Sequence, residues 1–254
     1  MTSERHIGGS CHDRNAVSPY RVGRTHRSRR AHLQRIGVMD MNGHVSERDP
    51  DQPSIMWINS RKASRSTITM NDVVPFDIEA GKRIGEGDEP PSEYHIHTEI
   101  YRRRPDVFSI VHSHPEHILT LSAAGHRLRQ VSAICPFLPA EGAPLFDSAV
   151  LINTKERGTA VATVLGDAGA VVLRQHGTVV VGGSLEEAVV RMICAEDNAR
   201  LQFRTLQIGE PRYIAGEELA VLKKENLAPI IYRKFWHYHE ESARTAGALD
   251  GITG

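Results

Sequence analysis

The sequence has little cysteine and no long apolar run. Its three cysteines, Cys11, Cys135 and Cys194, lie far apart, are odd in number and form no CxxC pair. That pattern is typical of reduced thiols in a cytosol, and it predicts a cytoplasmic location. No apolar run approaches the roughly 20 residues of a membrane-spanning helix, which excludes an integral membrane protein.

The sequence also has no overall excess of positive or negative side chains. Lysine plus arginine and aspartate plus glutamate number 31 each, so bulk charge gives no reason to expect nucleic acid or an anionic membrane as a partner. Residues 1–35 break the balance, because they hold eight arginines against Glu4 and Asp13 and show almost no apolar periodicity. We expect a disordered basic arm there. Its composition fits a transit peptide, an RNA-binding tail or sequence translated from upstream of the true start.

The rest of the chain has the composition of an ordinary globular protein. An apolar fraction of 40% and a charged fraction of 24% fit one domain, which we expect over residues 36–245 with a flexible tail at 246–254. Strand and helix patterns interleave along this domain. They predict a layered α/β fold in which helices cover a sheet, but they do not give the order of the strands.

Several of these elements have clear signals at their ends. Ser92 is a candidate N-cap for a helix that ends at Pro105, and Pro115 suits the first turn of the next helix. Ser184 and Glu187 form a capping box that opens a long amphipathic helix. The β-rich segments are residues 54–60, residues 107–114, and residues 168–183, the last read as two strands hinged at Gly177.

Histidine recurs at alternate positions three times, as His95 with His97, His112 with His114 and His237 with His239. Alternate residues share one face of a strand and stand about 7 Å apart at Cα, whereas on a helix they point to nearly opposite sides. His95 and His97 fall in a predicted helix, so we interpret them as unrelated surface or interface groups. His112 and His114 follow Ile110 on one face of a predicted strand and can converge on one cation.

A third histidine strengthens the metal hypothesis. His176 ends another apolar segment and precedes Gly177, whose missing side chain lets backbone or ligand approach closely. Three neutral imidazoles on rigid strands leave coordination positions open, as in catalytic metal sites. The alternative is that the histidines are structural, since the motif is short.

Glu93 follows the candidate cap Ser92. An acidic residue in a first helical turn is common because it interacts favourably with the helix dipole. The functional alternative is a general acid or base beside the metal, with a pKa raised by desolvation.

Two stretches carry a family resemblance. PSEYHIHTEIYRRRPDVFSIVHSHP at 91–115 and LRQHGTVVVGGSLEEAVVRMICAEDNARL at 173–201 resemble the class II aldolase and adducin family. The resemblance covers roughly residues 31–210. It implies a three-layer α/β/α sandwich around a mixed, largely antiparallel sheet, in a homotetramer with active sites at subunit interfaces. It also implies one divalent cation per subunit on the matching His112, His114 and His176, and a catalytic carboxylate at Glu93.

The resemblance is weaker to the sugar-phosphate enzymes of the family. They tend to have Gly-Asn before a serine, a Thr-Pro-Ser-Gly-like loop and paired serines before the glutamate, whereas here the first stretch reads GHVS at 43–46 and the last Pro-Ser at 91–92. The GHVS form is similar to decarboxylases of hydroxylated aromatic carboxylates. Substrate contacts are then expected from His44, Ser46, Arg48 and Ser92. Arg48 is preferred to Arg61 and Arg65 as the carboxylate partner.

These features predict a metal-dependent carbon–carbon lyase. The preferred reaction is decarboxylation of a small anionic substrate, a hydroxylated aromatic carboxylate such as 3,4-dihydroxyphthalate. Retro-aldol cleavage of a small hydroxy-carbonyl compound or sugar phosphate is the alternative, because the same cation stabilises either product anion. A non-catalytic adducin-like interaction protein is a third. A cupin-type oxygenase is disfavoured because Glu116 is too close to His114.

Two points of the site stay open in the sequence. The resemblance suggests that a late tyrosine, here Tyr238, enters an active site, although the surrounding aromatic residues also suit packing at an interface. Imidazole and carboxylate ligands suit zinc, manganese, iron and cobalt, so the cation is not identified.

Overall fold

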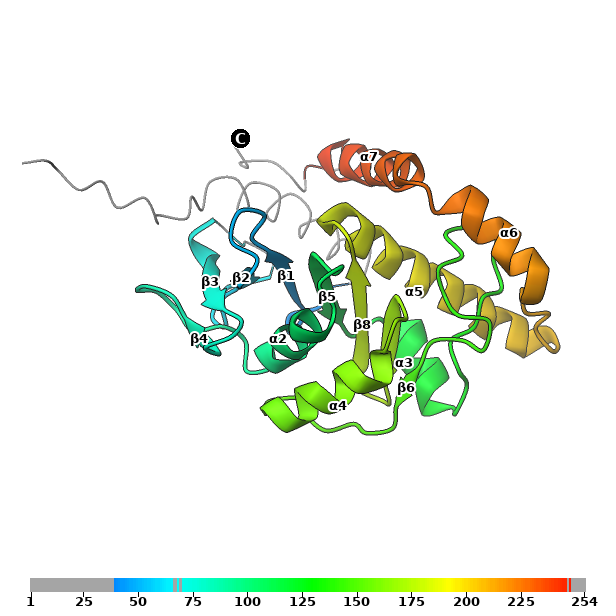
Figure 1. The fold of residues 1–254 in the computed structure, drawn as a ribbon. Coiled ribbons are helices and arrows are strands. Elements are labelled where there is room, and N and C mark those ends of the chain that lie inside the picture. The colour runs from blue at the N-terminus through cyan, green and yellow to red at the C-terminus, as the bar shows by residue number, and fades with distance from the viewer. Residues whose placement is uncertain (1–38, 66–67, 69, 246, 248–254) are drawn as a thin grey trace, which may run out of the picture.

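A computed structural model of the chain describes residues 39–65, 68, 70–245 and 247 (Figure 1). The predicted basic arm at 1–35 lies outside the described residues, as does the predicted tail at 246–254 apart from Gly247. Among the described helices, none combines the length and the apolar character that a membrane span needs.

Eight strands form a single sheet in the order β4-β3-β2-β1-β5-β8-β7-β6. Neighbouring strands run antiparallel except for the parallel pair of β6 and β7. The mixed, largely antiparallel sheet that the resemblance implied is therefore confirmed. The strands are β1 His44–Arg48, β2 Ile55–Asn59, β3 Val73–Asp77, β4 Lys82–Arg83, β5 Ser109–Ser113, β6 Leu145–Phe146, β7 Ala170–Leu173 and β8 Gly177–Gly182.

Helices cover both faces of the sheet, which gives three layers. The described helices are α2 Tyr94–Arg103, α3 Glu116–Ala123, α4 Lys155–Leu165, α5 Leu185–Ile208, α6 Gly216–Asn226 and α7 Pro229–Thr245, with a 3-10 turn η1 at Met70–Asp72. Helices α2 and α4 pack together on one face, and α3 and α5 pack on the other, with α7 against α5 (Figure 1).

Alternate residues of the strands point to opposite faces of the sheet, and each face has its own hydrophobic core. In β5, Val111 packs toward α3 and α5, while Ile110 packs toward α2 and α4. In β8, Val180 packs on the same face as Val111, and Val181 packs on the same face as Ile110. Because His112 is two residues after Ile110, it points toward the face that α2 and α4 cover.

The Ser184 cap and the buried side of α5 are confirmed. Ser184 Oγ accepts a hydrogen bond from the Glu187 amide at 3.2 Å, which satisfies an amide that the first turn leaves without a helical partner. Glu187 Oε2 accepts at 2.9 Å from the amide of Gly183, one residue before the cap, rather than from the Ser184 amide of a capping box. Leu185 and Met192 lie on the buried side of the helix.

Two predicted boundaries are wrong. Helix α2 begins at Tyr94 with Glu93 at the cap position and no capping bond from a side chain, because the Glu93 carboxylate is turned into the histidine cluster instead. The hinge of the last two strands lies at residues 174–176, where Gln175 has a φ of 56°, and Gly177 already belongs to β8.

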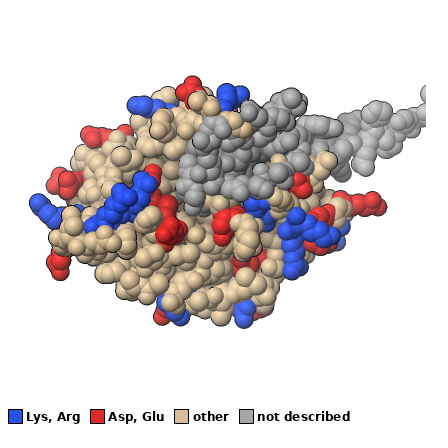
Figure 2. All heavy atoms as spheres, turned by 180° about the vertical axis from the view of Figure 1, so that it is seen from behind, with Lys and Arg blue, Asp and Glu red and all other residues tan. Residues whose placement is uncertain are grey.

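Surface charge is mixed on the face that Figure 2 shows. In the described part of that face, basic and acidic side chains lie interspersed among other residues. The expectation that nucleic acid is not a partner stays a prediction.

Candidate metal centre and cavity

The register of the sheet brings His44 and His112 together. Strands β1 and β5 pair antiparallel with His44 opposite His112, and their rings lie 4.8 Å apart between centroids. Directly opposed residues of an antiparallel pair have the closest Cβ atoms of any cross-strand neighbours. His44 therefore meets His112 although 68 positions separate them in the chain.

His114 and His176 join His112 at the ends of strands. His114 follows β5 directly, and His176 ends the turn that leads into β8, the neighbour of β5. Ring centroids lie 4.8 Å apart for His112 and His114, and 5.5 Å apart for His114 and His176. One ligand nitrogen from each of the three lies within 4.8 Å of the others. The structure thus brings together the three histidines that the sequence singled out.

Gly177 makes this approach possible. A Cβ built at Gly177 would lie 2.6 Å from the Ser113 carbonyl oxygen, 2.9 Å from His114 Cδ2 and 3.1 Å from His112 Cε1. The close backbone contact that the sequence predicted at this glycine is therefore present.

Gly177→Ala should lower both stability and metal affinity. Overpacking of this kind costs about 1–3 kcal/mol of unfolding free energy, and here the displaced groups are His112 and His114 themselves. Thermal unfolding and zinc titration measure the two effects. Gly209→Ala is the matched control, because no atom lies within 4 Å of a Cβ built there. Equal melting temperatures for Gly177→Ala and the wild type would contradict the steric argument.

His112 Nε2 has a lone pair that could bind a cation. Its Nδ1 lies 3.0 Å from the Thr178 carbonyl oxygen, which can only accept, so Nδ1 carries the proton of the neutral ring. Burial and the neighbouring imidazoles lower the pKa of His112 well below its usual range. Among the described residues Nε2 has no hydrogen-bond partner, although it is fully buried. A buried acceptor of this kind fits a cation, which would satisfy it.

Asp40 orients the second histidine and was missed in the sequence. Its Oδ2 lies 2.8 Å from His114 Nδ1, while its Oδ1 accepts hydrogen bonds from the amides of Asn42 and Gly43. A carboxylate behind a histidine fixes the ring and leaves Nε2 as the ligand atom. The Asp-x-Asn-Gly turn signal marks a local bend, but it does not reveal a partner 74 residues away.

Glu93 lies among the histidines at the start of α2. Its Oε1 accepts a hydrogen bond from the Ile152 amide at 2.8 Å and lies 3.4 Å from His176 Nε2. Its Oε2 lies 3.8 Å from His112 Nε2 and 3.9 Å from His44 Nε2. With only 7% of its surface exposed, the carboxylate serves the cluster rather than the helix dipole.

The expected rise in the pKa of Glu93 is not found. Burial does raise this pKa, but hydrogen bonds from His176 and His44 outweigh burial and hold it well below its usual range. Glu93 therefore rests as a carboxylate, able to accept a proton before it donates one.

A cavity of about 440 Å³ opens beside the cluster. It is lined by Met41, Asn42, His44, Arg61, Arg65, Pro91, Ser92, Glu93, His114, Leu151 and His176. Arg65 is buried there, and the carbonyls of Gly43, Ser60 and Ala63 hold its Nε and Nη1. Arg61 is exposed at the same cavity. The predicted contact residues His44 and Ser92 thus reach the cavity.

Arg48, the predicted carboxylate partner, does not line the cavity. Its guanidinium donates to the carbonyls of Val107, Pro53 and Tyr101. His44 and Arg48 share a face of β1, but Arg48 is at the far end of the strand, where α2 finishes. Arg48 ties that end of α2 to the sheet, and Arg61 and Arg65 take its place at the cavity.

Ser46 and His97 also differ from expectation. Ser46 is fully buried, and its hydroxyl contacts His97 Nδ1 at 2.6 Å, so it supports the site from behind rather than from within the cavity. His97 is fully buried too, and its Nε2 lies 2.7 Å from His44 Nδ1. The interpretation of His97 as a surface or interface group is therefore wrong, although the helix does separate it from His95.

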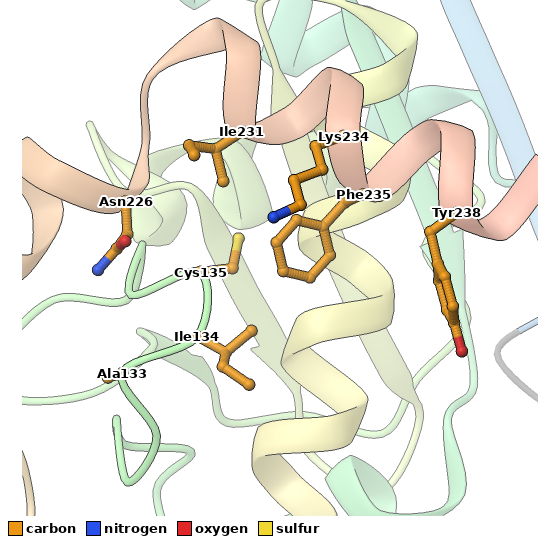
Figure 3. A pocket seen from close by; sticks show the side chains of 8 residues that line it. All are labelled: Ala133, Ile134, Cys135, Asn226, Ile231, Lys234, Phe235 and Tyr238. Atoms are coloured by element: carbon orange, nitrogen blue, oxygen red, sulfur yellow. The ribbon is translucent and has the colours of Figure 1, made fainter.

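Tyr238 lies away from the histidine cluster. It is 68% exposed and lines an apolar groove of about 520 Å³ between α7 and residues 133–135. Figure 3 shows the α7 side chains over that segment, with Tyr238 at one end. None of the residues that line this groove belongs to the histidine cluster. Within one chain Tyr238 does not reach the candidate site.

The structure is an α/β/α sandwich with a cluster of histidines and one carboxylate at the strand ends, and these groups could hold a metal ion. Residues 27–203 match the class II aldolase and adducin N-terminal domain, so the chain belongs to that family. A solved L-fuculose 1-phosphate aldolase from Glaciozyma antarctica superposes with a TM-score of 0.76 at 21% identity, covering 89% of this chain and 90% of that one. That likeness shows the fold.

Two relatives with different activities are similar in sequence. A 3,4-dihydroxyphthalate decarboxylase from Terrabacter sp. is 34% identical over 149 residues, which cover 57% of this chain and 59% of that protein. An L-fuculose phosphate aldolase from Escherichia coli is 30% identical over 194 residues, which cover 75% of this chain and 86% of that protein. The chain is thus similar both to a carboxy-lyase and to an aldehyde-lyase.

Proposed function

We propose that this protein is a divalent-metal-dependent decarboxylase of a hydroxylated aromatic carboxylate, of the 3,4-dihydroxyphthalate type. The observation that carries the proposal is the pair of arginines, Arg61 and Arg65, at the cavity that also holds Glu93 and the histidines. Guanidinium groups bind carboxylates through charge-assisted hydrogen bonds. Arg61 can do so bidentately, whereas the Nε and Nη1 of Arg65 already donate to backbone carbonyls. Similarity to the Terrabacter 3,4-dihydroxyphthalate decarboxylase supports the same substrate class.

The histidines, the arginines and Glu93 each have a separate role in the proposed reaction. A cation on His112, His114 and His176 would supply Lewis-acid stabilisation of negative charge. Arg65, held in place by backbone carbonyls, binds the substrate carboxylate together with Arg61. Glu93 lies where it can take the proton of the substrate hydroxyl. When CO2 leaves with the carbon–carbon bond broken, Glu93 returns that proton to the ring carbon, and solvent supplies the net proton that the product hydroxyl needs.

A paired assay tests the proposal. The protein is loaded in turn with zinc, manganese, iron or cobalt, and CO2 release from hydroxylated aromatic mono- and diacids is compared with aldehyde release from sugar phosphates. We expect CO2 release with at least one metal, faster from diacids than from monoacids because two arginines face the cavity. Aldehyde release from sugar phosphates without CO2 release from any aromatic acid would instead establish the aldolase, which the Escherichia coli relative favours.

We further propose a homotetramer with active sites between subunits. Tyr238 is exposed beside an apolar groove of its own chain, where it is free to reach a neighbouring subunit. Light scattering at micromolar concentration should then give the mass of four chains, and the mass of a single chain would refute the assembly.

A further inference from the structure

Two exposed apolar side chains line the cavity beside the histidine cluster. Met41 is 80% exposed and Leu151 is 46% exposed, and both are among the residues that surround this space. A single exposed leucine or methionine is common on protein surfaces and carries no information. Here two of them lie at one cavity, together with the arginines, the histidines and Glu93 that the proposed reaction uses.

The backbone on both sides of Leu151 is fixed. Its carbonyl oxygen accepts a hydrogen bond from Arg157 Nη1 at 2.8 Å, and the amide of the next residue, Ile152, donates to Glu93 Oε1 at 2.8 Å. The Ile152 side chain is fully buried, so it anchors this segment in the core. Leu151 is therefore exposed on an anchored segment, one residue from the amide that binds the Glu93 carboxylate.

Met41 lies in a turn that Asp40 closes. Asp40 Oδ1 accepts hydrogen bonds from the amides of the two residues that follow Met41, at 3.0 and 2.7 Å. Asp40 Oδ2 lies 2.8 Å from His114 Nδ1. The turn that carries Met41 is thus tied to the histidine cluster, as is the segment that carries Leu151.

The cavity combines this apolar surface with positive charge. Arg61 and Arg65 line the same space, and binding sites for small molecules commonly join apolar side chains to a few charged groups. A hydroxylated aromatic acid matches both features, because its ring has two apolar faces and its carboxylates and hydroxyls lie around the ring edge. A sugar phosphate carries hydroxyls along its carbon chain, and apolar contacts would take them out of water without a hydrogen-bond partner.

We propose that Leu151 and Met41 are specificity-determining residues that bind the face of the substrate ring. They favour an aromatic acid over a sugar phosphate because they bury the apolar surface of the ring, while the arginines hold its carboxylates. Neither side chain has a part in proton transfer or in binding the cation. This inference rests on the proposed function for its substrate class, but it concerns binding and is measured without turnover.

Polar substitutions of similar volume test the proposal. Leu151→Asn and Met41→Gln keep the approximate size of each side chain and remove its apolar character. The parent protein for both is zinc-loaded Glu93→Gln, in which proton transfer is removed, and calorimetry gives the dissociation constant of 3,4-dihydroxyphthalate. We expect this constant to rise about tenfold in each variant, the lower end of the range for a lost methylene contact in an apolar pocket.

A second ligand and two further variants serve as controls. Tartrate carries two carboxylates and two hydroxyls, as 3,4-dihydroxyphthalate does, but it has no ring, so its dissociation constant should not change. Val150→Asn should leave both constants unchanged, because Val150 is 45% exposed next to Leu151 but does not line the cavity. Leu151→Met restores an apolar side chain of similar volume and should bind 3,4-dihydroxyphthalate as the parent does.

Parent-like affinity for 3,4-dihydroxyphthalate in both Leu151→Asn and Met41→Gln would overturn the proposal. So would an equal loss of affinity for tartrate, or a parent protein that does not bind 3,4-dihydroxyphthalate. A lower mass by light scattering in both variants, with unchanged affinities, would show instead that a neighbouring subunit covers the two side chains.

The failure of this proposal is distinguishable from the failure of the proposed function. A loss of affinity that depends on the ring, in a protein that with Glu93 intact releases no CO2 from any aromatic acid, would support the ring contact and reject the decarboxylase. CO2 release from aromatic acids together with unchanged affinities in the variants would do the reverse.

Discussion

His112→Asn is expected to lower the affinity for a divalent cation by at least about 100-fold and to abolish turnover. The asparagine amide can keep the hydrogen bond to the Thr178 carbonyl that His112 Nδ1 makes, but it offers no lone pair in place of Nε2. Changes behind a metal ligand already cost about 10- to 100-fold in affinity. His112 belongs to both groups of residues that could hold a metal ion, one with His114 and His176 and the other with His44 and Glu93. Competition with a chelating dye gives the affinity.

The control for this variant is His126→Asn, because His126 is exposed and outside both donor sets. It should bind the cation as the wild type does. A His112→Asn variant that is folded by circular dichroism and binds the cation with wild-type affinity would remove His112 from the site.

Glu93→Gln is expected to lower kcat by about 10²- to 10⁴-fold while one cation is still bound. The amide can accept the hydrogen bond from the Ile152 amide, so the local structure is kept, but it cannot carry a proton. The imidazoles of His112, His114 and His176 remain to hold the cation. Steady-state CO2 release, measured with metal content in the same samples, separates loss of proton transfer from loss of metal.

Glu116→Gln provides the comparison for a helix-dipole effect. Glu116 is an exposed acidic residue in the first turn of α3, so its loss removes a favourable interaction with a helix dipole and nothing at the cavity. We expect wild-type kcat from it. Equal kcat in Glu93→Gln and the wild type would mean that Glu93 has no part in proton transfer.

The pairing of His112 with His114 could be predicted because it is local: the two are alternate residues at the end of a β-branched run. That His176 joins them depends on the pairing of β5 with β8, which the family resemblance implied and the strand pattern alone did not. The Ser184 cap of α5 is local in the same sense as the histidine pair.

The supporting residues could not be predicted because they depend on packing between distant segments. Helical spacing predicts that His97 is a surface or interface group, yet the face of α2 that carries Ile100 and Tyr101 also carries His97 toward the sheet. Asp40 reaches His114 across 74 positions. Arg48 has the strand alternation of His44, but which end of β1 lies at the cavity follows from the sheet register and from α2, neither of which the sequence pattern gives.

X-ray anomalous scattering at a metal absorption edge tests the account most directly. Crystals of the full chain soaked with zinc or cobalt should show one strong peak per subunit, about 2.0–2.3 Å from His112 Nε2 and bonded to further donors of the cluster. A peak bonded elsewhere, or no peak at the cluster under saturating metal, would contradict the metal-dependent lyase.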